Sequence, residues 1–131
     1  MLHQLRRRVT EALGSAHQVL VSTWGPADVQ VERMSCEGVG LVLYVLVPKT
    51  SDLLFNLENH TDVVVTSDTW QARGKARLLA VGSHPDKLAL ASRPEAAWCQ
   101  VAEIRPTRLH LYPTNGQTSG ETIDTFREPP A

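Results

Sequence analysis

The side chains best suited to chemistry lie in a short polar turn, Pro48-Lys49-Thr50-Ser51. An almost continuous apolar run, residues 41–47, precedes this turn, and the pattern of residues 51–59 predicts a short helix after it. The turn brings a cation and two hydroxyls to a helix start, where free backbone N–H groups and the helix dipole favour an anion. This combination is typical of a phosphate site. The next residue, Asp52, is acidic and opposes an anion there.

The elements that must position this turn follow from hydrophobic periodicity. Residues 2–13 have apolar side chains at helical spacing, and Pro85 favours a second helix over 84–93. Strands are predicted at 18–24, 29–35, 41–47, 61–67, 70–81 with a bend at Gly74, and 97–112 with an interruption near Pro106. Short strands without a βαβ rhythm indicate a mainly β protein with small α inserts, built as an antiparallel barrel. We therefore expect one domain over 1–112 and a loose or partner-wrapping tail over 113–131.

Composition excludes several classes of function. The 131 residues suffice for a single domain, and 42% hydrophobic with 21% charged residues is ordinary for a globular protein. Thirteen basic against 14 acidic residues give a net charge of −1, so we expect neither nucleic acid nor a membrane as partner. The two cysteines, Cys36 and Cys99, form no metal-ligand pattern, and the five histidines are scattered. The sequence predicts a cytoplasmic protein with reduced thiols and no metal, although one disulfide stays open.

Three stretches resemble the pyridoxamine 5′-phosphate oxidase-like family of FMN-binding split β-barrels. The first is an N-terminal helix that leads through a strand to Gly25-Pro26. The second is residues 43–57 followed by 58–65, which is similar to the family's strand, Ser-Arg-Lys turn, Asn-Leu helix and next strand. The third, Trp70-Gln71-Ala72-Arg73-Gly74-Lys75-Ala76, is similar to the family's strand ending in Gly-(Lys/Thr)-Ala. The resemblance covers residues 5–112 and implies a six-stranded antiparallel split β-barrel.

The resemblance also implies a cofactor and a partner. In such proteins FMN lies at a homodimer interface, with its phosphate on the Ser-Arg-Lys turn and its ring against strand backbone of both subunits. The residues expected to bind the cofactor are Arg33, Val47, Lys49, Thr50, Ser51, Trp70 and Gln71. Ser51 matches the family's turn, whereas Asp52 and Leu53 replace its Arg and Lys. Lys49 and Arg33 are the cations that could compensate, because charge-assisted bonds hold phosphate most strongly.

Two functions follow from this pattern. The first is a flavin-dependent oxidoreductase of the split-barrel class, in which the cofactor performs the chemistry on a substrate that the sequence does not identify. No general acid or base stands out, so no catalytic residue is assigned. The second is a non-catalytic dimeric split barrel that has lost tight FMN binding or holds another ligand. A deazaflavin or haem-type ligand in the same groove is a further option.

Overall fold

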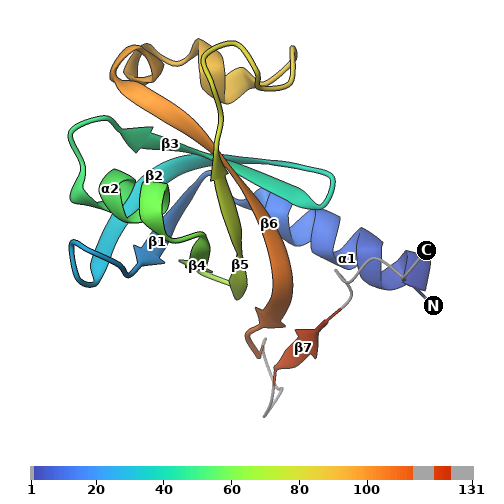
Figure 1. Ribbon diagram of the computed structural model, residues 1–131. Helices are drawn as coiled ribbons and strands as arrows, with labels where there is room; N and C mark the ends of the chain where they lie inside the picture. The colour runs from blue at the N-terminus through green and yellow to red at the C-terminus, as the bar shows by residue number, and fades with distance from the viewer. Residues whose placement is uncertain (1, 114–119, 125–131) are drawn as a thin grey trace, which may run out of the picture.

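The chain folds around a closed antiparallel barrel (Figure 1). The computed structural model describes residues 2–113 and 120–124. Its strands are β1 Gln18–Thr23, β2 Gln30–Val39, β3 Val42–Pro48, β4 Asp62–Thr66, β5 Trp70–Leu78, β6 Cys99–Leu111 and β7 Glu121–Ile123. Its helices are α1 Leu2–Ser15 and α2 Asp52–Asn59, with 3₁₀ helices η1 Ala89–Ser92 and η2 Pro94–Trp98.

The strands are hydrogen-bonded in the order β3-β2-β1-β4-β5-β6-β7, and a further pairing of β3 with β6 closes the first six into a barrel. All of these pairings are antiparallel. This architecture confirms the predicted six-stranded split barrel with small helical inserts. The interior is filled by apolar side chains from all six strands and from both α helices.

Strand β5 shows how the sequence determines the two faces of the barrel wall. Its residues alternate between buried and exposed, as a strand with one wet face must. Trp70, Ala72 and Ala76 point inward, while the intervening polar and basic side chains point outward. The predicted bend occurs at Gly74, where the register with β6 shifts and β6 carries one extra residue. A Cβ on Gly74 would lie 2.7 Å from a backbone oxygen of β6, so the close approach requires glycine.

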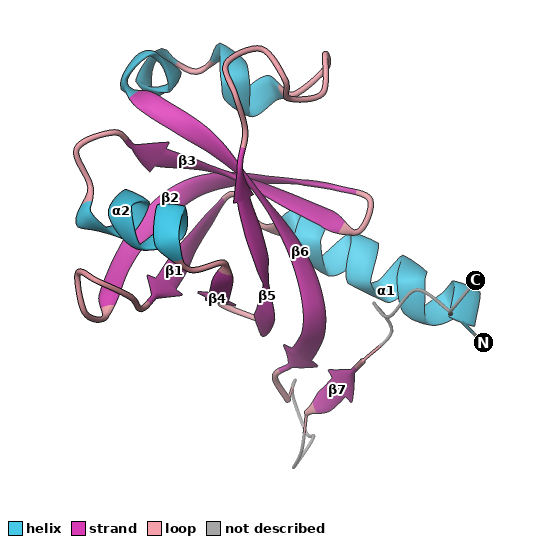
Figure 2. Cartoon of the chain, in the orientation of Figure 1, coloured by secondary structure: helices cyan, strands magenta, loops and turns pink. Residues whose placement is uncertain are grey.

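Helix α1 closes one end of the barrel, and α2 lies on the other side of the molecule (Figure 2). Val9 and Leu13 of α1 are fully buried in the core. The indole Nε1 of Trp70 donates a hydrogen bond to the backbone oxygen of Ala12 at 3.0 Å, which ties α1 to the start of β5. Gly38 of β2 permits close contact with α1, because a Cβ there would lie 2.5 Å from the backbone of Leu13.

Two predicted elements differ from the structure. The helix expected over 84–93 is wrong: the chain instead forms η1 and η2, which are separated by the extended Arg93, and Pro94 begins η2. Leu88 and Leu90 there pack on outward-facing side chains of β3, so tertiary packing overrides the helical pattern. The interruption of β6 near Pro106 is also wrong. That proline lies opposite Gly74 at the register shift, where a missing N–H is tolerated, and β6 continues.

Part of the segment expected as a tail belongs to the sheet. Residues 121–123 pair with β6 as β7, and Ile123 is buried in the barrel core. The Arg8 guanidinium of α1 donates two hydrogen bonds to the Glu121 carboxylate, so β7 is held from two sides. The loose-tail prediction therefore fails for these residues, whereas 114–119 and 125–131 lie outside the described residues. None of the described helices is both long and apolar enough to cross a bilayer.

Candidate functional site

The predicted phosphate turn is present, but its hydroxyl is already engaged. Ser51 caps α2: its Oγ accepts a hydrogen bond from the Leu53 backbone N–H at 3.0 Å. The same hydroxyl donates to a carboxylate oxygen of Glu32, which reaches the turn from β2. Asp52 follows in the first turn of α2 and is exposed. Two carboxylates therefore lie at the helix start that was expected to receive a phosphate.

This turn does not fit an FMN phosphate. The side chain of Leu53 points into the barrel core and is fully buried, so it leaves no cation where the family's turn has one. The Ser51 hydroxyl already donates its hydrogen bond to the Glu32 carboxylate, so it is not free to donate to a phosphate. A phosphate at the turn would also have to approach the carboxylates of Glu32 and Asp52. Repulsion between like charges and the loss of the serine donor both oppose phosphate binding.

The other expected residues lie on different surfaces of the chain. Arg33 is exposed on the opposite face of β2 from Glu32, because successive strand residues alternate. The side chains of Val47 and Trp70 are completely buried in the core, so within one chain only their backbone can meet a ligand. Gln71 is exposed on the outer face of β5, where its Nε2 donates to Thr66 Oγ1 at 3.3 Å. Lys49 and Thr50 are exposed beside Ser51. The seven residues thus form no single site within one chain.

The outer wall of the barrel carries a pocket of about 530 Å³ between β4, β5 and the Trp24 side chain. Val64 and Trp24 supply apolar lining, and Arg73 and Lys75 supply cations. Lys75 is paired with the carboxylate of Asp62, and this hydrogen bond holds the pKa of the Asp62 carboxyl below its ordinary value. Within residues 2–113 and 120–124, Arg73 makes no ion pair. An aromatic wall beside an available guanidinium suits a flat anionic ligand.

A second, more polar pocket of about 210 Å³ adjoins the first, since Arg73 lines both. Its other lining side chains come from three neighbouring strands: Gln71 of β5, Arg108 and His110 of β6, and Thr122 of β7. Arg73 and Arg108 face each other in the strand register. Arg108 lies 3.6 Å from Asp124, and His110 Nδ1 lies 2.9 Å from Thr122 Oγ1. We call the two pockets together the outer-wall groove.

Sequence reasoning missed part of this groove for a physical reason. The outward direction of Arg73 follows from the alternation of β5. In β6, however, the extra residue at the register shift leaves Thr107 and Arg108 both exposed. The alternation of inward and outward side chains is therefore offset by one residue beyond this point. The contribution of Thr122 depends on β7, which the sequence does not predict. Only Gln71 among the seven expected residues lines the outer-wall groove.

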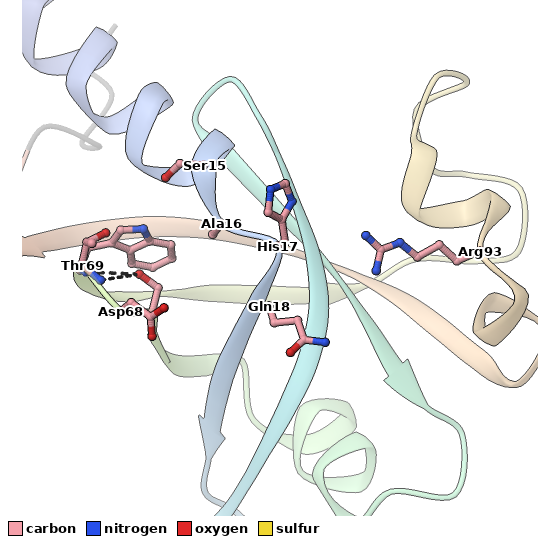
Figure 3. Close-up of a pocket in the computed structure, with 9 residues that line it drawn as sticks. Ser15, Ala16, His17, Gln18, Asp68, Thr69 and Arg93 are labelled. Carbon is pink, nitrogen blue, oxygen red and sulfur yellow. Dashed lines mark hydrogen bonds between the residues drawn. The ribbon is translucent and has the colours of Figure 1, made fainter.

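A further polar pocket, of about 500 Å³, lies between the C-terminal end of α1 and the β4–β5 turn (Figure 3). His17 and Arg93 extend into it from separate segments, and Asp68 brings a negative charge. Arg93 also lies 3.7 Å from the carboxylate of Glu95. These charges have opposite signs and come from separate segments that do not converge on one point. The pocket is therefore interpreted as a water-filled depression and not as a ligand site. In the part of the chain that the structure describes, no three His, Cys, Asp or Glu side chains gather as a metal site.

No protein-family model and no curated protein sequence matches this chain. Solved structures match its fold. A protein from Listeria innocua, provisionally named a pyridoxamine 5′-phosphate oxidase, is 16% identical, with a TM-score of 0.65 over 82% of this chain and 97% of that one. A heme-binding protein from Mycobacterium smegmatis is 13% identical, with a TM-score of 0.66 over 92% of this chain and 57% of that one. An F420 reductase is 18% identical, with a TM-score of 0.58 over 76% of this chain and 94% of that one.

These similarities agree with the fold expected from the resemblance. Because all three identities lie below 20%, they show a shared split-barrel architecture and carry no residue-level assignment. The names of the three proteins point to different cofactors or activities. The shared fold therefore does not identify a ligand, and the ligand of this chain must be inferred from its own side chains.

Proposed function

We propose that this chain is a flavin-binding split-barrel protein that holds its cofactor in the outer-wall groove and functions as a flavin-dependent oxidoreductase. The observation that carries the proposal is the continuity of this groove. An aromatic and apolar half around Trp24 joins a half rich in hydrogen-bond donors through a shared side chain, Arg73. A flavin mononucleotide has the same division, with a flat conjugated ring at one end and a phosphate at the other.

The donor set of the groove fits the cofactor better than the turn does. Arg73 and Arg108 would hold the phosphate, with the Gln71 amide and the Thr122 hydroxyl as further donors. Trp24 and Val64 would support the ring. When bound, the flavin itself supplies electron and hydride transfer. The chain's own contribution is to orient the ring, neutralise the phosphate and exclude water from one ring face.

A second copy of the chain is the proposed partner. Beside the groove, the outer faces of β1 and β2 expose Leu20 (38%) and Val31 (54%). Ser22 of β1 lies opposite Val31 of β2 on one side and opposite Val64 of β4 on the other. The exposed apolar surface is therefore continuous with the groove. Docking of a second copy would cover it and could bring the acidic α2 turn of one subunit towards the arginines of the other. Closed two-fold dimers are the commonest solution for such a surface.

The alternative is a non-catalytic dimeric binding protein that has lost tight FMN binding or holds another ligand, and a deazaflavin or haem-type ligand in the same groove is a further option. The contact between Glu32 and Ser51 favours it, because an acidic turn removes the anchor expected for tight FMN binding. For either function we place the protein in the cytoplasm. The free thiols of Cys36 and Cys99 support this compartment, since cytosolic thiols stay reduced.

The test is titration of the purified full chain with FMN, followed by quenching of flavin fluorescence. Arg73→Met and Arg108→Met should each weaken binding about 10- to 100-fold, because each removes a charge-assisted contact. Arg6→Met is the matched control, since Arg6 is an exposed arginine on α1, outside the groove. Equal affinity of all three variants would contradict the placement of the phosphate.

The same preparation separates the two functions. If the protein is an oxidoreductase, a nicotinamide donor should bleach the bound flavin at a rate well above that for free flavin. Stable binding of FMN, F420 or hemin without any reduction by the donor would favour the binding protein. Failure of all three ligands to bind would overturn both functions. Sedimentation should show a dimer, and a stable monomer at high concentration would contradict the proposed partner.

A further inference from the structure

The segment that links β5 to β6 borders a half-open cavity of its own. Residues 79–98 pass over the outer face of β3, where Leu88 and Leu90 pack against Tyr44 and Leu46. Between this segment and the ends of β3 and β6 a cavity of about 520 Å³ remains. Its volume lies within the range of small-molecule sites. It shares no lining residue with the outer-wall groove.

Hydrogen bonds fix the frame of this cavity. The Lys49 backbone N–H donates to the Trp98 oxygen at 3.0 Å, so the β3–α2 turn is tied to the end of η2. The Leu79 N–H donates to the Val101 oxygen at 2.9 Å, and the Gln100 amide donates to the Leu79 oxygen at 3.2 Å. The segments that line the cavity are therefore held together by hydrogen bonds that involve backbone atoms. The cavity does not depend on the positions of exposed side chains alone.

The lining is mixed, with apolar side chains over much of it and a cation at one side. The apolar side chains are Leu79, Val81, Val101 and the alanines at 80, 91, 96 and 97. Lys49 supplies an ammonium group, and His84 and Gln100 supply polar side chains. Lys49 makes no ion pair within the described residues, so its charge is available to a ligand. The Cys99 thiol also lines the cavity, close to both the Lys49 ammonium and the Glu95 carboxylate.

We propose that this cavity binds a small monocarboxylic acid with an apolar body, such as a medium-chain aliphatic acid. The apolar walls would cover the body, and the Lys49 ammonium would pair with the carboxylate. A phosphate monoester suits the cavity less well, because a single lysine faces its two negative charges. A neutral apolar ligand would gain nothing from the ammonium, which is exposed and solvated by water. In this proposal Lys49 binds a ligand in a cavity separate from the outer-wall groove that is proposed for the flavin.

Calorimetric titration of the full chain with octanoate tests this assignment. We expect saturable binding of octanoate and at least tenfold weaker binding of octanamide, which has the same chain without the charge. Lys49→Met should weaken octanoate binding at least tenfold. Lys87→Met is the matched control, because Lys87 lies exposed on the same segment but does not line the cavity. It should leave the affinity unchanged.

A second measurement locates the ligand. Ala96→Leu places additional side-chain volume in the cavity and should abolish octanoate binding, while circular dichroism reports that the variant is folded. Octanoate should also slow alkylation of Cys99 by iodoacetamide, with mass spectrometry reading the site. Absence of octanoate binding, equal affinity of Lys49→Met and Lys87→Met, or full binding by folded Ala96→Leu would each overturn the proposal.

Discussion

The buried side chain of Asn56 provides the sharpest test of how α2 supports the outer-wall groove. Asn56 is completely buried, and its side chain makes one hydrogen bond to the last residue of β1 and two to the segment between β1 and β2. Its Nδ2 donates to the Asp28 oxygen at 2.8 Å and to Thr23 Oγ1 at 3.2 Å. Its Oδ1 accepts from the Ala27 N–H at 2.9 Å. This segment includes Trp24, the aromatic wall of the groove.

The expected magnitude follows from these three bonds. Asn56→Ala leaves a buried donor and two acceptors without their partner. At about 1 kcal/mol net for each bond, the variant should lose about 2–4 kcal/mol of unfolding free energy. Such a loss lowers the melting temperature by about 10 °C in a domain of this size. Urea denaturation followed by circular dichroism measures it directly, because the midpoint shifts while the slope stays constant.

Asn59→Ala is the matched control on the same helix. Asn59 is exposed, and its Nδ2 donates only to the Phe55 backbone oxygen at 2.8 Å, so its loss should cost less than about 0.5 kcal/mol. Asn56→Ala should in addition weaken flavin binding, since Trp24 loses its support, whereas Asn59→Ala should not. A loss of stability no greater for Asn56→Ala than for Asn59→Ala would refute the reasoning.

Three further predictions concern the barrel and its edges. Gly74→Ala should destabilise the fold by about 2 kcal/mol or more in urea denaturation, because its Cβ would meet the backbone of β6 at 2.7 Å; a loss below about 0.5 kcal/mol would contradict the close approach. Burial raises the pKa of the Cys36 thiol to about 11, so iodoacetamide should modify Cys99 in the native protein and both thiols in urea, as mass spectrometry would show. The hydrogen bond from Arg8 holds the pKa of the Glu121 carboxyl below its ordinary value, so this contact stabilises the fold above the ordinary carboxyl range and is lost as pH falls through the lowered pKa. Thermal denaturation of Glu121→Gln should therefore differ from wild type near neutral pH and converge with it in acid; a constant difference would exclude the linkage.

Much of the barrel could be predicted because its strands carry a local signal. The alternation of β5 revealed the outward basic side chains, and the hydroxyl and acidic residues at 51 and 52 marked the start of α2. The contact between Ser51 and Glu32 joins residues that are 19 positions apart, so no local pattern could reveal it. It changes the turn from an expected phosphate site into an acidic one.

The remaining differences have the same cause. Leu88 and Leu90 fit a helical pattern, but the outer face of β3 decides how they pack. The arginines of the outer-wall groove come together only because β5 and β6 are paired with a shifted register. Trp70, expected near a cofactor ring, is buried with its indole on α1. Long-range pairing, and not local propensity, determined which expected residues could share a site.

The placement of β7 has a consequence for the behaviour of the protein at high concentration. Each strand of the six-stranded barrel has at least two hydrogen-bonded neighbours, so among the described strands only β7 has a single one. An unpaired strand edge is a template for aggregation, and proteins commonly protect such edges by keeping them short or charged. β7 is three residues long and carries Glu121, bound to Arg8. Detachment of β7 would uncover the longer edge of β6, and the first effect should be self-association rather than unfolding.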